Sequence, residues 1–299
     1  MRNYQEELEE KYRKLGVSPE AHMEGLLHRK PINYWDYVSL ETLMTLQKPL
    51  TDHPDEEIFI IYHQVTELVL KLLTNELKQM VGKNELSADE IKVKLGRITR
   101  YTNLLITSFG IMEEGMDYDS YNTFRTSLAP ASGFQSVQFR EIEMYCTPLI
   151  NLVNAKGKER LKASTSLESL IENLYWKDAG LNRKTGEKSL TLRQFETKYL
   201  PSLGKLAIAM EGKSLLHKVL KYQDDAELIQ LLKDFDFQYN VAWPMVHLKT
   251  AAKYLDSKGE NKEATGGSEW KKYLHPKHQQ RVFFPFLWEN ESILDYKKK

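Results

Sequence analysis

Apolar side chains recur at steps of three and four residues through most of this 299-residue chain, which is the spacing of one face of an α-helix. Runs that alternate apolar and polar residues are scarce apart from a short RVFFPFLW near the end. The pattern predicts an all-α fold, a large single-domain helical bundle. We expect helices at about 3–15, 37–47, 55–82, 88–114, 121–128, 134–150, 166–177, 203–222, 225–235 and 241–257.

Capping signals mark two of the expected helix starts. Ser87 with Glu90, and Thr165 with Glu168, have the spacing of a capping box, in which each side chain bonds the other residue's free backbone amide. No linker is long or biased enough to divide the chain, so we expect one domain over residues 1–299. The segments that read as loops are 115–120, 179–189 and 257–269.

Charge and cysteine content exclude several classes of protein. The 42 basic and 42 acidic residues give a formal net charge of zero, without the basic surplus of a nucleic-acid binder. The charged amphipathic start lacks the apolar core of an export signal, and no run of 18 apolar residues predicts a membrane span. Cys146 is the only cysteine, which excludes an intrachain disulfide or cysteine-rich zinc site. We therefore expect a cytoplasmic protein without nucleic-acid or membrane partners.

Fourteen consecutive positions between Arg125 and Arg140 carry no charge, although 28% of the chain is charged. The run suggests burial with hydrogen bonds still to be made. It fits a ligand wall or, more commonly, a buried turn that enters a helix. Its polar side chains include Ser127, Ser132, Gln135, Ser136 and Gln138.

A histidine stands opposite the main apolar stripe of the segment DEEIFIIYHQVTELVLKLL. His63 points about 170° away from that stripe, beside Phe59 one turn earlier. Because this second face is also apolar, the helix should be buried on both sides. Its main stripe should face the core, and its second face should contact either more protein or a bound apolar ligand. A lone histidine here is more often a satisfied core residue than a functional one. The stripe that we expect to face the core consists of Ile58, Ile61, Val65, Leu68 and Leu72.

A second histidine lies in the segment NVAWPMVHLKTAAKYL. Trp243 and His247 stand four residues apart on one helix face, next to the small residues Ala251 and Ala252. A neutral imidazole beside an aromatic ring and free space is one way to ligate a haem iron, although the pattern alone is not specific. Pro244 has no amide proton, so the helix should begin or kink near Trp243.

Other catalytic patterns fail on spacing. The chain has no HExxH, no GxGxxG after a strand, no Walker loop and no GxSxG elbow. His275 and His278 read as a surface pair rather than a metal site. Arg125 is either a surface residue or, if buried, a partner for an anion. The ATGGSE turn is a flexible loop, or one that lets backbone close over a ligand with the Thr265 hydroxyl available.

Taken together, several segments resemble the tryptophan 2,3-dioxygenase family of haem enzymes, in the same order and over most of the chain. The FR, SGFQS and QFR cluster, with FIxxHQxxEL before it, carries the most specific part of the resemblance. The matching segments are YWDYVSLETLMTLQ (34–47), DEEIFIIYHQVTELVLKLL (55–73), YNTFRTSLAPASGFQSVQFREIE (121–143), and WPMVHLKTAAKYL followed by ATGGS.

The resemblance implies an all-α homotetramer with one haem b per subunit, active as Fe²⁺. The family inserts both atoms of dioxygen across the indole C2–C3 bond of L-tryptophan to give N-formylkynurenine, which is the entry to tryptophan catabolism by the kynurenine pathway. His247 would be the axial ligand of the haem iron, and His63 would be the catalytic residue that receives the indole N–H. Arg125 would pair with the substrate carboxylate, and Thr265 with the carboxylate and ammonium region.

The resemblance also implies roles for residues around these four. Phe59 and Tyr121 would wall the indole pocket. The residues against the haem would be Ser132, Gly133 and Trp243. An N-terminal segment with Tyr34, Tyr37 and Val38 would complete the pocket of a neighbouring subunit.

Three features depart from the family pattern. Val69 follows the HQxxEL motif, where the family usually has an aromatic residue. Pro244 stands where the family typically has an arginine, and four more residues than in familiar members separate His247 from the TGG turn. Two other functions therefore stay open on sequence grounds. One is a related haem monooxygenase or hydroxylase of an indole or phenol, and the other is a non-enzymatic haem-binding helical protein.

Overall fold

The computed structural model describes residues 3–162, 165–181, 185–256, 270–278 and 281–297. Within these ranges the chain forms helices and no strand, and only isolated bridges pair Val153 with Leu174 and Leu181 with Lys188. The all-α prediction is confirmed. The strand-like run near the end contains a 3₁₀ turn, Pro285–Trp288, instead of a strand. None of the helices in the described part combines the length and apolar character needed to cross a membrane.

The chain divides into two compact units, residues 1–48 and 49–299, and the expectation of one domain stays a prediction. The first unit holds four short helices with no buried side chain. Its second helix, α2, was not expected, and the expected helix at 37–47 is replaced by α3 and α4, joined at Ser39 in the left-handed region (φ 55°). The bounds are α1 Tyr4–Lys14, α2 Pro19–His28, α3 Tyr34–Val38 and α4 Leu40–Leu43.

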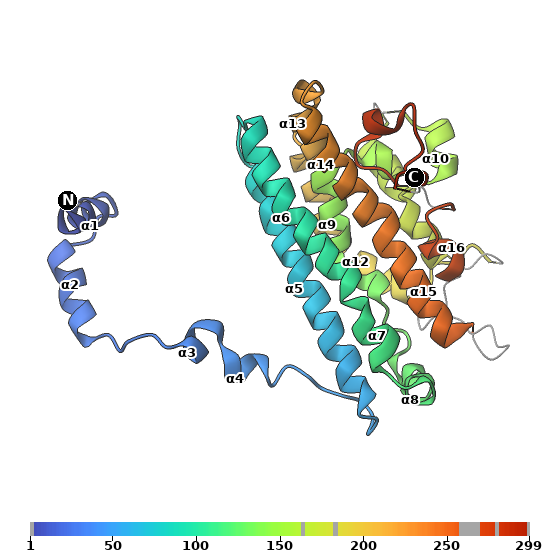
Figure 1. Cartoon of the computed structure of the whole chain (residues 1–299), viewed down its shortest axis with the longest axis horizontal. Coiled ribbons are helices and arrows are strands. Elements are labelled where there is room, and N and C mark those ends of the chain that lie inside the picture. The colour runs from blue at the N-terminus through green and yellow to red at the C-terminus, as the bar shows by residue number, and fades with distance from the viewer. Residues whose placement is uncertain (1–2, 163–164, 182–184, 257–269, 279–280, 298–299) are drawn as a thin grey trace. The chain divides into compact units, whose positions relative to one another are not determined.

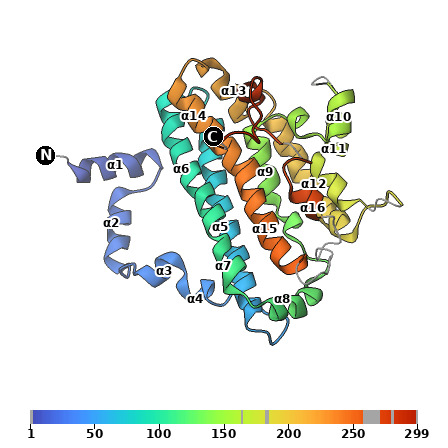
Figure 2. The ribbon, with the colours of Figure 1, turned by 45° about the vertical axis from the view of Figure 1, so that its right-hand side comes forward.

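The second unit is a bundle built around two long helices. Helix α5 (Asp55–Val81) packs against α6 (Ala88–Thr107) and α9 (Val137–Cys146), and α6 in turn packs against α14 (Ala226–Phe237). Helix α15 (Trp243–Leu255) continues the direction of α14, and Figures 1 and 2 show this pair alongside α5 and α6. The expected helices at 55–82, 225–235 and 241–257 are confirmed to within a few residues.

Shorter helices complete the unit. The expected helix at 203–222 is wrong at both ends. Ser189 caps α12, Pro201 is accommodated inside that helix, and α12 ends at Ala209, before α13 begins at Leu215. The capping box at Thr165 is also wrong: Ser166 is the N-cap residue, and its hydroxyl accepts the Ser169 amide. The bounds are α7 Phe109–Gly115, α8 Tyr118–Phe124, α10 Ala155–Arg160, α11 Leu167–Glu172, α12 Leu190–Ala209, α13 Leu215–Val219 and α16 Trp270–Leu274.

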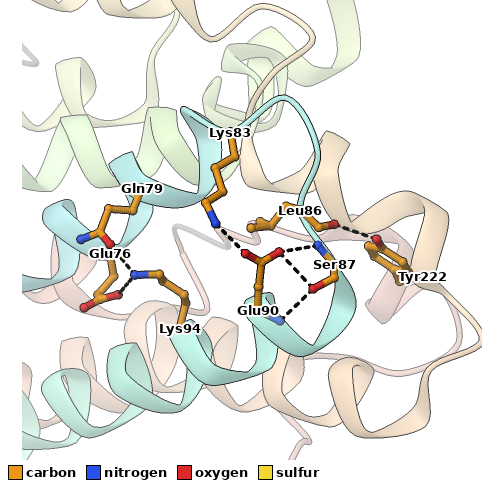
Figure 3. A network of polar contacts seen from close by, with 8 residues as sticks. All are labelled: Glu76, Gln79, Lys83, Leu86, Ser87, Glu90, Lys94 and Tyr222. Atoms are coloured by element: carbon orange, nitrogen blue, oxygen red, sulfur yellow. Dashed lines mark hydrogen bonds and ion pairs between the residues drawn. The ribbon is translucent and has the colours of Figure 1, made fainter. Parts of the chain in front are cut away.

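The turn between α5 and α6 is fixed by polar contacts (Figure 3). Ser87 and Glu90 form the predicted capping box, with the Glu90 carboxylate 3.0 Å from the Ser87 amide. Lys94 joins the two helices through an ion pair of 2.7 Å to the buried carboxylate of Glu76. Tyr222 donates to the carbonyl oxygen of Leu86 and ties the segment after α13 to this turn.

Only part of the apolar stripe expected to face the core from α5 does so, because Ile58 and Val65 pack against the core but the other three residues do not. Ile61, Leu68 and Leu72 are 42%, 52% and 44% exposed. The buried side chains of α5 lie on another face and include Tyr62, Val69, Leu70, Leu73 and Leu77. Periodicity cannot decide which face meets the core when a helix is apolar on several sides.

Candidate functional site

A cavity opens between α5, α7, α8, α15 and the segment that precedes α9. Its lining residues range from Phe59 to Arg281, so segments far apart in sequence meet at one place. Seven of the site residues that the family resemblance implied line this cavity: Phe59, His63, Tyr121, Ser132, Gly133, Trp243 and His247.

Helix α5 fixes the orientation of His63. Its Nδ1 lies 2.7 Å from the carbonyl oxygen of Phe59, and the two rings lie 4.1 Å apart. A carbonyl oxygen can only accept, so Nδ1 donates and a neutral ring leaves Nε2 as an acceptor. Burial lowers the pKa of His63, although the Phe59 carbonyl and Glu67 oppose the shift. His63 is therefore a neutral acceptor on the cavity wall.

Helix α15 presents His247 to the same cavity. Its ring is open to the cavity but enclosed by protein, and burial, with a smaller effect of His63, lowers the pKa of His247 to about 4. One turn earlier, Trp243 stacks on Phe139 with ring centroids 4.9 Å apart and planes 9° apart. A neutral imidazole beside a flat aromatic wall suits a metal bound in a planar ring.

Two aromatic residues that sequence reasoning missed connect the histidines. Tyr62 contacts His63 at 5.5 Å, Phe109 contacts Tyr62 at 5.4 Å, and His247 contacts Phe109 at 5.3 Å between ring centroids. Phe109 and Tyr62 both line the cavity. No motif marked Phe109, because its role depends only on where α7 packs.

A buried polar cluster lies along another part of the cavity wall. Arg140 and Arg281 line the cavity, and Nη1 of each lies 3.3 Å from the Glu143 carboxylate. Each guanidinium also donates to the Tyr175 hydroxyl, at 2.6 and 2.8 Å. The hydroxyl of Tyr239, 1% exposed, has no hydrogen-bond partner within the described ranges. The sequence marked only Arg140 of this cluster, as the end of the uncharged run.

The uncharged run forms part of the cavity wall but is not deeply buried. Ser132 and Gly133 line the cavity, while Ser127 is exposed. The Ser132 hydroxyl accepts the Phe134 amide, and the Gln138 amide donates at 2.7 Å to the Glu67 carboxylate. Most polar side chains of the run therefore make hydrogen bonds, as expected, whereas the buried hydroxyl of Ser136 has no partner within the described residues.

The remaining predicted site residues lie in three places. Arg125 is buried next to Tyr121 but is not among the residues that line the cavity; burial raises the pKa of Tyr121, and Arg125 opposes that shift. Thr265 lies outside the described residues. The N-terminal residues Tyr34, Tyr37 and Val38 belong to the first unit, where all three are exposed.

The other histidine pair gives no metal site. His275 and His278 have ring centroids 5.7 Å apart, and His278 is exposed. Across the part of the chain that the structure describes, no group of three or more histidine, cysteine, aspartate or glutamate residues could hold a metal ion.

Comparison with known proteins gives one consistent result. The family model described as tryptophan 2,3-dioxygenase matches residues 22–171. A tryptophan 2,3-dioxygenase of Bacillus cereus is 30% identical over 279 residues, covering 89% of this chain and 94% of the relative. A protein of the same name from Exiguobacterium sibiricum is 27% identical, and the match covers 89% of this chain and 94% of the relative. One from Pseudomonas fluorescens is 26% identical, and the match covers 88% of this chain and 91% of the relative.

Proposed function

The chain belongs to the tryptophan 2,3-dioxygenase family, and from this premise we propose how its cavity carries out the family's reaction. The protein is an oxidoreductase that adds both atoms of dioxygen across the indole C2–C3 bond of L-tryptophan, giving N-formylkynurenine for tryptophan catabolism. The observation that carries the site assignment is the presence of two neutral histidines, presented by α5 and α15, on the wall of one aromatic cavity.

The residues of the cavity fit a haem b. His247 would supply a neutral nitrogen ligand to the haem iron, and Trp243, stacked on Phe139, would supply a flat wall for the macrocycle. Haem also carries two carboxylates, and guanidinium groups bind carboxylates well. Arg140, Arg281 and the orphaned hydroxyl of Tyr239 supply donors for them. Ser132 and Gly133, which also line the cavity, would lie against the haem.

The chain's own residues would orient the substrate. Bound haem supplies the iron that activates dioxygen. His63 would accept the indole N–H at Nε2, because Nδ1 is already committed to the Phe59 carbonyl. Phe59 and Tyr121, whose rings are 6.1 Å apart, would form the apolar walls that hold the indole plane and exclude water. Arg125 would hold the carboxylate, and Thr265 the carboxylate and ammonium region.

We further propose a homotetramer in which Tyr34, Tyr37 and Val38 complete the pocket of a neighbouring subunit. Tyr34 and Tyr37 are 69% and 77% exposed, which suits residues that are covered only on assembly. The exposed stripe of Ile61, Leu68 and Leu72 on α5 supplies a second apolar surface. We also propose a cytoplasmic location, supported by the single, buried free thiol of Cys146.

The decisive experiment uses haem-loaded, reduced protein, L-tryptophan and labelled dioxygen, followed by the mass of the product. Two labelled oxygen atoms in N-formylkynurenine are expected. One labelled atom would indicate the monooxygenase alternative, and absence of product from protein with bound reduced haem would reject tryptophan as the substrate. For the assembly, light scattering should give four subunits for the parent protein and fewer for Leu68→Glu with Leu72→Glu.

A further inference from the structure

The helix that carries His247 contains a turn of π-helix. Helix α14, the π turn Gln238–Ala242 and α15 follow one another without a break from Ala226 to Leu255, as the continuous orange ribbon in Figures 1 and 2 shows. The Trp243 amide donates to the carbonyl oxygen of Gln238, five residues earlier, instead of four. A single π turn of this kind takes up one residue more than an α-helical turn.

This additional residue changes the direction in which α15 presents its side chains. The buried residues Leu228, Leu232 and Phe235 mark the core face of α14. At about 100° per residue, an unbroken α-helix would point His247 about 90° away from the centre of that face. If the π turn absorbs one residue without rotation, the angle falls to about 10°. The observed lining of the cavity by His247 agrees with the second value.

Other side chains of α15 also indicate that the π turn absorbs one residue. An unbroken helix would place Lys249 about 70° and Ala251 about 130° from the centre of the core face, whereas the π turn changes these angles to about 170° and 30°. Lys249 is 73% exposed, and Ala251 lines the cavity. Tyr254, 2% exposed, moves from about 70° to 30°. The buried Thr250 moves the other way, to about 70°, and lies at the edge of the face.

Pro244 explains why the irregular turn occurs at this position. Proline has no amide proton, so it cannot donate to Asn240 at α spacing or to Tyr239 at π spacing. In a regular helix its ring would also collide with the carbonyl four residues earlier. The wider π turn ends directly before Trp243 and Pro244, where the α pattern resumes.

We propose that residues 238–242 contain one surplus residue, and that the π turn, held in place by Pro244, rotates His247 onto the cavity wall. The π turn is thus a positioning device for the iron ligand, and this inference rests on the proposed haem-binding function. It makes an unusual prediction: removal of one residue should be tolerated, whereas addition of one should not.

The test compares two changes in the full chain. The first is deletion of Ala242 together with Pro244→Ala, because the proline ring would collide with a carbonyl of an unbroken helix. The second is insertion of one alanine after Ala242. Deletion gives an unbroken helix that still presents His247 on the cavity face, so haem content and the ferrous haem spectrum should stay within about twofold of the parent. Insertion rotates His247 by about 100° and should lower haem occupancy at least about tenfold. Loss of haem from a folded deletion variant, or equal haem content in both variants, would overturn the proposal.

A second readout does not need haem. In a Cys146→Ala background, Lys249→Cys should react much faster with a bulky maleimide than Ala251→Cys, both in the parent and after the deletion. After the insertion the two rates should become similar or reverse, with circular dichroism confirming a helical fold. A deletion variant that loses the parent's rate ratio would contradict the register assignment. If the parent protein itself binds no haem, the proposed function fails while the labelling ratio still decides the register.

Discussion

The Nδ1 atom of His63 lies 2.7 Å from the carbonyl oxygen of Phe59, one turn earlier on α5. The same turn places the Phe59 ring beside the imidazole, at 4.1 Å between centroids and with the ring planes tilted by 37°. One backbone carbonyl thus sets the tautomer of His63, and one side chain covers its face. Residues i and i+4 of a single helix therefore supply both the acceptor and part of the apolar wall.

The first prediction concerns the pH dependence of turnover. Burial lowers the pKa of His63 from 6.5, so the neutral acceptor persists to more acidic pH than in a free histidine. The acid limb of the kcat/KM profile should therefore lie below pH 6.5. His63→Ala should lower kcat/KM roughly 10²-fold and remove that limb. A parent profile that falls at or above pH 6.5, or an unchanged limb in His63→Ala, would contradict this role.

The second prediction concerns the iron ligand. His247→Ala should lower haem occupancy at least about tenfold, because the macrocycle loses its axial nitrogen while its aromatic wall remains. His247→Gly with added imidazole should recover part of the ferrous haem spectrum. His217→Ala is a matched control, since His217 lies on α13 and bonds to Ser214. Equal haem content in His247→Ala and His217→Ala would contradict the assignment of His247 as the iron ligand.

Much of the fold followed from local signals. The Ser87 and Glu90 box fixed the start of α6, and helical periodicity gave α5 within one residue at its end. Local signals failed where tertiary packing decides. The helix start expected at residue 203 lies inside α12, and Leu68 of the apolar stripe lies on an exposed face. Where α12 begins and which face of α5 is buried both depend on contacts with residues that are distant in sequence.

The lining of the cavity was predictable mainly through the family resemblance. His63 and His247 line one cavity with Trp243, as the resemblance implied, whereas spacing alone favoured a core role for His63. Arg281 and Tyr239 could not be found in this way, because each reaches the cavity from a segment without a motif. The π turn was visible only as the helix-breaking tendency of Pro244; its rotation of α15 depends on packing against α14.

The third prediction concerns Arg125, which is buried beside Tyr121. Arg125→Lys keeps the charge but loses the planar fork that binds a carboxylate through two bonds. KM for L-tryptophan should rise roughly 10- to 100-fold with a smaller change in kcat, which corresponds to loss of a charged hydrogen bond. Haem content should not change. Arg97→Lys on α6, 49% exposed and paired with Glu76, should leave KM unaltered; similar KM values for both variants would argue against Arg125 as the carboxylate partner.

The last prediction concerns how the C-terminal segment supports the helix that carries His247. Asp236 is fully buried one residue before Phe237, the last residue of α14, and accepts the amides of Phe283 and Phe284 and the Trp288 indole N–H at 2.8–3.2 Å. Asp236→Ala would leave these donors without their acceptor and should lower the free energy of unfolding by about 3 kcal/mol.

Chemical denaturation of the haem-free protein measures this change. Asp234→Ala is the matched control two residues away, because its carboxylate pairs near the surface with Lys297 and should contribute less than about 1 kcal/mol. Since Asp236 lies two residues before the π turn, its loss should also weaken haem retention, whereas Asp234→Ala should not. Equal stability of the two variants would mean that the C-terminal segment is held by its apolar contacts alone.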